Sequence, residues 1–326
     1  MARLEWVLER TIFPLILGGG IAFSITRMNA GHNEALAVLP PLIFAYVAIA
    51  TLERVFFWRT EWLHSNGDLK VDIGHFLVSG IFTNQALAIP ATALSVVLAT
   101  WLADLTGGSF WPTHLSLWIQ LPIALVVGEF FLYWVHRLTH EVDFLWRFHA
   151  VHHSAPRLYF FNAVRFHPVD LAVSAFAPLI PLVMIGADAR IIALHGMVSA
   201  VHGLFQHANL KLKLGPLNWF FSMAELHRWH HSRNLEEANT NFGQNLIVWD
   251  IVFGTRFLPK DREPPSEIGL AGLPTFPMDY WGQLLSPIRW KAIRASSEAA
   301  IDAVDRSDAI NGAAPVDRSE SGSSAQ

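Results

Sequence analysis

Six apolar runs constrain the fold of this 326-residue chain more than any other feature. A helix needs about 20 apolar residues to cross the roughly 30 Å hydrocarbon core of a membrane. The second, third and fourth runs meet this length, whereas the other three are shorter. The runs occupy residues 11–26, 36–57, 73–100, 115–135, 168–186 and 190–205. We therefore predict an all-α integral membrane protein with about four to six membrane-embedded helices.

Local features refine this picture of the runs. Pro90 lies inside the third run and predicts a kink, because proline removes a backbone hydrogen bond from a helix. A short polar connection that begins at Gly186 joins the fifth and sixth runs, and it predicts a hairpin that does not fully cross. Glu5 and Glu9 interrupt the N-terminal segment, so we expect a retained anchor there and not a cleaved signal peptide.

The composition agrees with lipid surroundings and excludes several kinds of protein. Charged residues make up 15% and hydrophobic residues 52% of the chain, whereas soluble domains carry about 25% charged residues. The formal net charge of −4 provides no basic field, so no nucleic acid is expected as a partner. Cysteine is absent, which excludes disulfides, thiolate metal sites and a cysteine nucleophile.

The positions of Lys and Arg predict the orientation in the membrane. These residues are common after the second and fourth runs and after residue 206, and they are absent from residues 101–115. Because cytoplasmic loops carry an excess of Lys and Arg, the cytoplasmic segments are predicted to be 58–72, 136–167 and 206–326. The chain ends without a eukaryotic retrieval signal, so we expect a bacterial inner membrane.

Histidines form three clusters in these predicted cytoplasmic segments. The first is a pair four residues apart directly after the fourth run, and the other two share the pattern HxxHH. Spacings of three and four residues place side chains on one side of a helix. With 16 histidines in the chain, a random HxxHH is expected roughly 0.04 times, so two copies indicate a metal site. The clustered residues are His136, His140, His149, His152, His153, His227, His230 and His231.

The number of histidines favours two metal ions that share one cage. Imidazole suits zinc, copper, iron and nickel, and a single catalytic zinc takes only about three protein ligands. A zinc protease would need HExxH, and the run from His140 to Phe144 lacks the second histidine. His207, at the end of the sixth run, is predicted as a further ligand. His202 lies five residues earlier, about 140° around a straight helix, and would need a bulge to share its face.

Other polar residues near the clusters invite a functional interpretation. Glu129 precedes His136 by two helical turns, where it would accept a hydrogen bond from a ligand imidazole, pair with a buried Arg, or serve only in packing. His167 precedes Pro168 and is interpreted as a structural residue or a support behind the ligands. The segment Asn241-Phe-Gly predicts a turn that orders the chain after the third cluster. No role is assigned to His32, His64, His75 and His114.

Taken together, the motifs resemble the fatty acid hydroxylase superfamily, also called the sterol desaturase family. The resemblance covers roughly residues 115–260 and rests on EFFLYWVHRLTH, WRFHAVHHS, RFHP, ELHRWHHS, NFG and WDIVFGT. It implies a helical membrane core under a cytosolic helical, histidine-rich cap. It also implies a non-haem centre of two iron ions that uses O2 to hydroxylate or desaturate a lipid. The implied ligands are His136, His140, His149, His152, His153, His207, His227, His230 and His231.

The composition of the chain and the resemblance together set expectations for regions and partners. The predicted regions are membrane helices in 1–110, a catalytic region in 111–260, a C-terminal segment in 261–294 and a disordered tail in 295–326. The substrate lipid would enter from the bilayer through an apolar channel. Candidate wall residues are Phe130, Phe131, Trp134 and Phe205. The chain lacks cysteine and a GxGxxG fingerprint, so a separate electron donor is expected, either cytochrome b5-like or a ferredoxin with its reductase.

Two questions stay open at this point. The lipid could be a sterol, a fatty acyl chain, an alkylglycerol or an aminolipid, and hydroxylation cannot be separated from desaturation. The alternative function is a histidine-rich metal-binding membrane protein, either a transporter or a sensor, without redox chemistry. That alternative predicts metal ligands spread through the middle of the membrane, whereas these clusters follow the ends of apolar runs.

Overall fold

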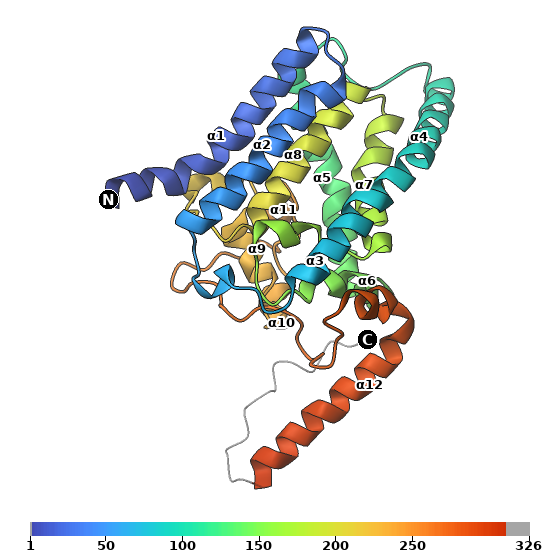
Figure 1. The fold of residues 1–326 in the computed structure, drawn as a ribbon. Coiled ribbons are helices and arrows are strands. Elements are labelled where there is room, and N and C mark those ends of the chain that lie inside the picture. Colours follow the sequence, from blue (N-terminus) through green and yellow to red (C-terminus); the bar gives the residue numbers. More distant parts are fainter. Residues whose placement is uncertain (1, 311–326) are drawn as a thin grey trace.

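A bundle of long helices forms one end of the molecule, and short helices and loops gather at the other (Figure 1). The computed structural model describes residues 2–310, and within them the regular elements are all helices. The long helices are α1 (Ala2–Asn29), α2 (Glu34–Val55), α4 (Asn84–Thr106), α5 (Leu117–Glu141), α7 (Pro168–Met184) and α8 (Ala189–His207). The predicted fold class, an all-α membrane protein with a helical cap, is confirmed.

Within residues 2–310, three helices are long and apolar enough to cross a membrane: α1, α2 and α5. A fourth span is possible if a broken helix counts as one crossing. This broken helix consists of α3 (Leu69–His75), the π-helix η2 (Phe76–Thr83) and α4, and it bends by 40° between Leu87 and Pro90. The bend confirms the kink predicted at Pro90. The first apolar run was expected to be short, but α1 continues it in both directions to a full crossing length.

Helices α7 and α8 form the predicted hairpin. Helix α7 has 17 residues, which is short for a crossing. At the connection Gly186 adopts a φ of 98°, a left-handed conformation that glycine tolerates. Asp188 then caps α8 by accepting a hydrogen bond from the backbone N–H of Ile191. Helix α8 packs against α1, α2 and α5 and contributes much of the apolar core, so it runs through the centre of the bundle.

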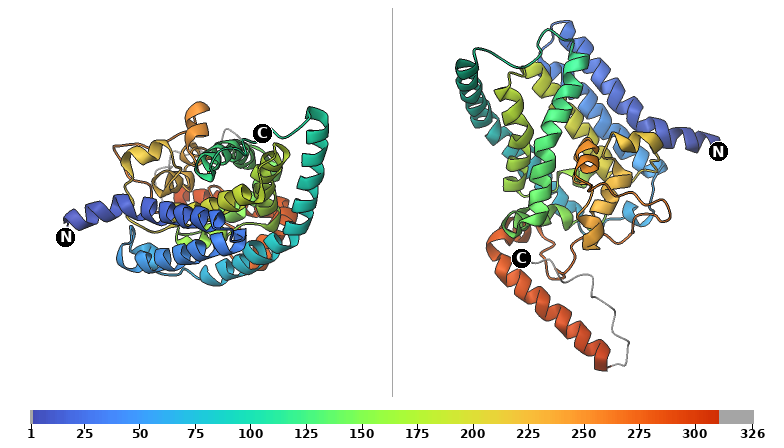
Figure 2. Two further views of the ribbon diagram at one scale, coloured as in Figure 1. Left: turned by 90° about the horizontal axis from the view of Figure 1, so that it is seen from above. Right: turned by 180° about the vertical axis from the view of Figure 1, so that it is seen from behind.

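Short helices build a cap around the end of α5 where His136 and His140 lie (Figures 1 and 2). The elements of the cap are η1 (Glu61–Leu63), α6 (Asp143–His153), η3 (Phe160–Val164), η4 (Gly215–Trp219), α9 (Ala224–His230), α10 (Leu235–Ala238) and α11 (Val248–Val252). All three histidine clusters therefore lie at one end of the bundle. The alternative function, a metal transporter, predicted ligands along the middle of the spans, and this arrangement differs from that prediction.

Buried charges attach the cap to the bundle. Arg157 Nε lies 2.7 Å from Asp68, and Arg165 Nε lies 2.6 Å from Asp72, so the segment after α6 is held to α3. The carboxylate of Glu53 on α2 accepts hydrogen bonds from the backbone N–H groups of Phe160 and Asn209. Because removing one partner of a buried ion pair leaves an uncompensated charge, these contacts fix the position of the cap.

The C-terminal helix α12 (Tyr280–Ile310) begins against the cap and then extends away from the molecule (Figure 2). The prediction of disorder from residue 295 is wrong for residues 295–310, which are helical. Alanine is frequent there and is the best helix former, and Arg294 pairs with Glu298 one turn later. The rest of the predicted tail, residues 311–326, lies outside the described residues.

Candidate metal centre

The nine predicted ligand histidines converge as two adjacent groups at the end of α5. Within each group, ligand nitrogens from all members lie within 4.8 Å of one another. We call them group one and group two. Group one consists of His136, His140, His149, His153 and His230. Group two consists of His152, His207, His227 and His231.

Each HxxHH motif serves both groups. On α6, the pair His149 and His153, four residues apart, belongs to group one, and His152 belongs to group two. On α9 and the residue after it, the division is reversed. His227 and His231 belong to group two, and His230 belongs to group one. Adjacent residues on a helix point about 100° apart, so one motif reaches two neighbouring sites.

The outer nitrogens of several imidazoles are held by protein acceptors. His136 Nδ1 lies 2.6 Å from the carbonyl oxygen of Phe242, and His230 Nδ1 lies 2.8 Å from that of Thr240. His149 Nδ1 lies 2.8 Å from the Asp170 carboxylate. Carbonyl and carboxylate oxygens only accept hydrogen bonds, so each of these Nδ1 atoms is the protonated one. In a neutral imidazole, Nε2 then presents its lone pair to the interior of the site.

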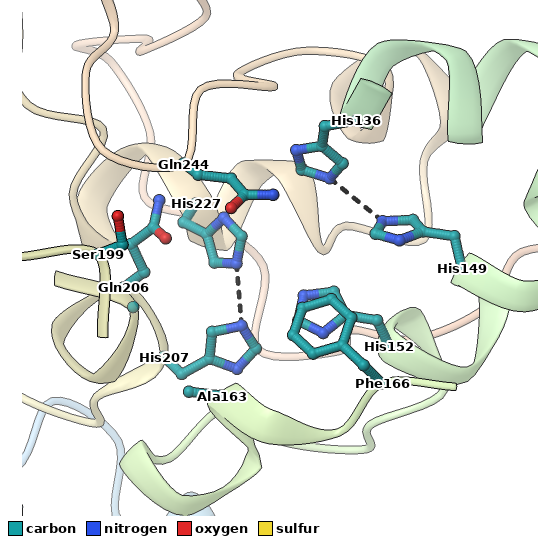
Figure 3. Close-up of a pocket in the computed structure, with 11 residues that line it drawn as sticks. His136, His149, His152, Ala163, Phe166, Ser199, Gln206, His207, His227 and Gln244 are labelled. Atoms are coloured by element: carbon teal, nitrogen blue, oxygen red, sulfur yellow. Dashed lines mark hydrogen bonds between the residues drawn. The ribbon is translucent and has the colours of Figure 1, made fainter. Parts of the chain in front are cut away.

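The same arrangement occurs in group two. His207 Nδ1 lies 2.9 Å from Asn162 Oδ1. The Asn162 amide nitrogen donates to the Arg157 carbonyl, which fixes its oxygen toward the imidazole. His207 Nε2 therefore also carries a lone pair, and it lies 3.0 Å from His227 Nε2 (Figure 3).

These facing nitrogens fit a bound cation. His136 Nε2 and His149 Nε2, both with lone pairs, lie 3.1 Å apart (Figure 3). The Nε2 atoms of His140, His153 and His230 are buried and have no hydrogen-bond partner among the described residues. Buried polar atoms without partners are costly, and lone pairs that face one another repel. A metal ion within each group would satisfy these atoms, so the residues present fit the centre that the motifs predict.

Burial keeps the extramembrane histidines in the state that metals require. Removal from water, together with the neighbouring imidazoles, lowers the pKa of His153, His230 and His231 well below the usual value. Neutral imidazole is the metal-binding form. The site is therefore prepared for cations before any ion arrives.

Three supporting residues were not recognised from the sequence. Asp170, in the first turn of α7, holds His149. Asn162 holds His207, and it carried no signal in the sequence because it lies in a short helix between motifs. His75, to which no role was assigned, is buried and lies 3.1 Å from the carbonyl oxygen of Phe166 and 2.9 Å from the Gln283 side chain. A carboxylate three residues after the histidine of RFHP was the available signal for Asp170.

Glu129 does not act on a ligand imidazole or pair with an Arg, as two of its three predicted roles would require. Its buried carboxylate accepts hydrogen bonds from the backbone N–H groups of Gln244 and Asn245. The predicted turn at Asn241 is confirmed, with a φ of 54°. The next residue, Phe242, supplies the carbonyl that orients His136. Glu129 and this turn therefore position the segment after the third cluster against α5.

Two predicted residues lie outside the groups. His202 is fully buried, with its ring centroid 5.5 Å from that of Phe13 and 6.1 Å from that of Phe221, and it belongs to neither group. Without a bulge in α8, the spacing of five residues separates it from His207, as predicted. His167 accepts a hydrogen bond from the backbone N–H of Val169 and caps α7, which confirms the structural interpretation.

A cavity of about 120 Å³ adjoins both groups (Figure 3). The histidines that line it are His136, His149, His152, His207 and His227. The other lining residues are Ala163, Phe166, Ser199, Gly203, Gln206 and Gln244. The candidate wall residues Phe130, Phe131, Trp134 and Phe205 do not line it. The first three pack among aromatic side chains from α5 and the region of α11, and Phe205 is in the core beside Phe13.

Comparison with known proteins agrees with this geometry. Residues 121–255 match the family model described as fatty acid hydroxylase. The chain is 39% identical over 274 residues to an ornithine lipid hydroxylase of Rhizobium tropici, and the match covers 83% of this chain and 82% of that protein. The chain belongs to the fatty acid hydroxylase family. Its resemblance to this family, inferred from the histidine motifs, is confirmed.

Other relatives match over shorter lengths. An alkylglycerol monooxygenase of Xenopus tropicalis is 32% identical over 41% of this chain and 30% of that protein. A putative Delta(7)-sterol-C5(6)-desaturase 2 of Arabidopsis thaliana is 28% identical over 43% of this chain and 49% of that protein. The chain thus spans less than half the length of these two relatives. No solved structure matches.

The fatty acid hydroxylase family membership fixes the general activity. This membrane protein is an oxygen-dependent oxidoreductase that hydroxylates or desaturates a lipid. The family and the two histidine groups together indicate iron binding. The lipid, the number of ions and the electron donor need further argument.

Proposed function

We propose that this protein hydroxylates an ornithine-containing aminolipid at a centre of two iron ions held by the nine histidines of groups one and two. The observation that carries the proposal is the convergence of nine histidines in two adjacent groups beside one cavity, with the Nε2 atoms of His140, His153 and His230 left without partners among the described residues. The choice of lipid rests on the ornithine lipid hydroxylase, which matches over most of both chains. The choice of two ions rests on the presence of two histidine groups.

The iron ions would supply the activation of O2, and the protein would supply geometry and a site shielded from water. Acceptors such as Asp170 and Asn162 hold the imidazoles so that Nε2 faces inward. Neither group contains a carboxylate among the described residues. Neutral imidazoles carry no charge, so the carboxylate of Asp170, 2.8 Å from His149 Nδ1, would offset part of the positive charge of the ions.

The polar wall of the cavity favours a substrate with a polar group near the reacting carbon. Ser199, Gln206 and Gln244 line the cavity on the side of His227 (Figure 3). Gln206 already donates a hydrogen bond to the Ser222 carbonyl, and Ser199 accepts one from Asn245. The side-chain amide of Gln244 is therefore the group that a bare alkyl chain would leave without a hydrogen bond. An amide or another headgroup polar group could hydrogen-bond with it. This supports an aminolipid over a plain hydrocarbon chain, and hydroxylation near the headgroup over desaturation far along a chain.

Lipid mass spectrometry of cells with and without the gene tests this function. The host must make ornithine lipids, and expression should convert them to species heavier by one oxygen atom. The His152→Ala variant should lose the product while still reaching the membrane. A loss of two hydrogen atoms would show desaturation instead. An unchanged lipid profile with altered metal uptake by the cells would favour the transporter.

Electrons would come from a separate donor protein that binds near the end of α5. His140 is the group-one histidine with partial exposure. The Trp146 ring, which is also partly exposed, lies with its centroid 5.1 Å from that of His140 and 5.4 Å from that of His153. These rings form a contact route from the surface to group one. A cytochrome b5-like protein or a ferredoxin with its reductase would each suit this role.

The orientation and regions complete the proposal. We place the histidine cap on the cytoplasmic face of a bacterial inner membrane, because Lys and Arg gather in the segments that form it. Residues 111–260 would be the catalytic region, with 1–110 and 261–294 as flanking segments. Protease treatment of inverted and right-side-out vesicles tests the orientation. Cleavage at α12 in right-side-out vesicles alone would reverse it.

A further inference from the structure

Helices α6 and α9 exchange roles between the two histidine groups, since each supplies a pair of histidines to one group and a single histidine to the other. The long helices do not complete this symmetry. Group one receives a four-residue pair from α6 and a single histidine from α9. Group two receives a four-residue pair from α9 and a single histidine from α6. Group one also receives a pair from a long helix, His136 and His140 of α5. From its own long helix, α8, group two receives only His207.

The missing position is occupied by Gly203. Residues four apart on a helix share a face, so the partner of His207 in such a pair would be residue 203. Gly203 lines the cavity, and a Cβ added there would have no atom within 4 Å. His202 does not take this place, since its ring nitrogens belong to neither group and its ring lies edge-on against Phe13. The face of group two beside Gly203 is therefore open space.

We propose that a group-two ion would keep an open coordination position toward the cavity at Gly203, where group one has a fifth histidine. This inference rests on the proposed function, because it assumes that both groups bind iron. Three of the four group-two histidines line the cavity, compared with two of the five in group one. Catalytic metal sites keep a position free for a reactant, whereas structural sites fill it. Group two is thus where small molecules reach the metal.

Two differences between the ions follow from this asymmetry. The group-two ion has one imidazole fewer and faces a cavity, so it leaves the protein faster when a chelator is added. It also binds small anions that the group-one ion does not. Neither property requires the lipid or the electron donor, so both are measured on the purified, iron-loaded full chain.

The test uses Gly203→His, which adds the missing imidazole. Iron release to excess EDTA should show two phases of equal amplitude in the unaltered protein. Supporting groups behind a ligand change metal affinity about 10- to 100-fold, so a new ligand should slow the fast phase at least about tenfold. Azide should change the absorption spectrum with saturation at one azide per chain. Gly203→His should abolish this change.

Two further variants separate coordination from the filling of space. Gly203→Leu fills the cavity without a ligand atom, so it should weaken azide binding and leave the fast phase of iron release unchanged. Gly196→His adds the same imidazole two turns earlier on α8. A Cβ added at Gly196 also meets nothing within 4 Å, but Gly196 does not line the cavity. It should change neither measurement.

The proposal is overturned if iron leaves the unaltered protein in a single phase, if two azides bind per chain, or if Gly203→His leaves the fast phase unchanged. Should Gly203→His fail to fold, the release and azide measurements on the unaltered protein still decide. Equivalent ions in a protein that makes hydroxylated lipid would reject this inference alone. Absence of iron or of lipid product would reject the proposed function.

Discussion

Replacement of Asp170 by alanine should weaken iron binding at group one. The carboxylate lies 2.8 Å from His149 Nδ1, and the side chains of Asp170 and His149 are only 2% and 4% exposed. A hydrogen bond to a charged group contributes about 1.5–3 kcal/mol, and burial removes the screening by water that would reduce this value. Since each 1.4 kcal/mol is a factor of ten, we expect a loss in affinity of about 10- to 100-fold.

The assay is a competition between the purified protein and a chelator of known affinity, with iron counted per chain. Asp170→Asn keeps an oxygen that can accept the hydrogen bond but removes the charge, so its affinity should lie between those of the unaltered protein and Asp170→Ala. Asp261→Asn, at an exposed position, is the control and should have no effect. The reasoning is refuted if Asp170→Ala retains iron with unaltered affinity, or if all three variants lose it equally.

Three other perturbations address separate parts of the site. Trp146→Leu should slow reduction of the iron by a donor protein, as followed by absorbance in a stopped-flow experiment, and should leave reduction by dithionite unchanged. Trp281→Leu, at an exposed position, is the control. An unchanged rate for Trp146→Leu would contradict the proposed route. Gln244→Leu should lower kcat/KM for the lipid by about tenfold, because one hydrogen bond is lost, and should leave the iron content unchanged. A kcat/KM equal to that of the unaltered protein would show that Gln244 does not contact the substrate. Asn241→Ala should destabilise the protein by about 3 kcal/mol, because three side-chain hydrogen bonds are lost, as measured by denaturation in detergent. Asn241→Gly should lose less, since glycine tolerates the positive φ, and greater stability of the alanine variant would refute this explanation.

The histidine positions could be predicted because helical spacing acts over a few residues. An HxxHH motif on a helix must place its imidazoles on one side, and the apolar run before His136 must continue as a helix through His140. The distribution of each motif between two groups could not be predicted. It depends on how α6 and α9 face each other, and this packing is absent from either motif alone.

The residues that support the ligands were harder to find because they act across long stretches of chain. Asp170 is 21 residues from His149. Glu129 lies 116 residues before Asn245, whose backbone N–H it binds. A carboxylate inside an apolar helix signals a buried partner, but it does not indicate whether that partner is an imidazole, a guanidinium or a backbone amide. Helix α12 was missed for a local reason. Its small and polar residues led to a prediction of disorder, although its alanines favour a helix.

The division of each HxxHH motif has a consequence for how far apart two bound ions can lie. His152 and His153 are neighbours on α6, as are His230 and His231 at the end of α9, and each neighbouring pair serves both groups. The separation of the two sites is therefore set by the spacing of two adjacent residues on each of two rigid helices. A dinuclear centre whose spacing depends on a bridging side chain can lengthen or shorten when that bridge moves. Here the backbone of two helices fixes the distance between the two sites, so a change in the charge of the metals should leave that distance nearly constant.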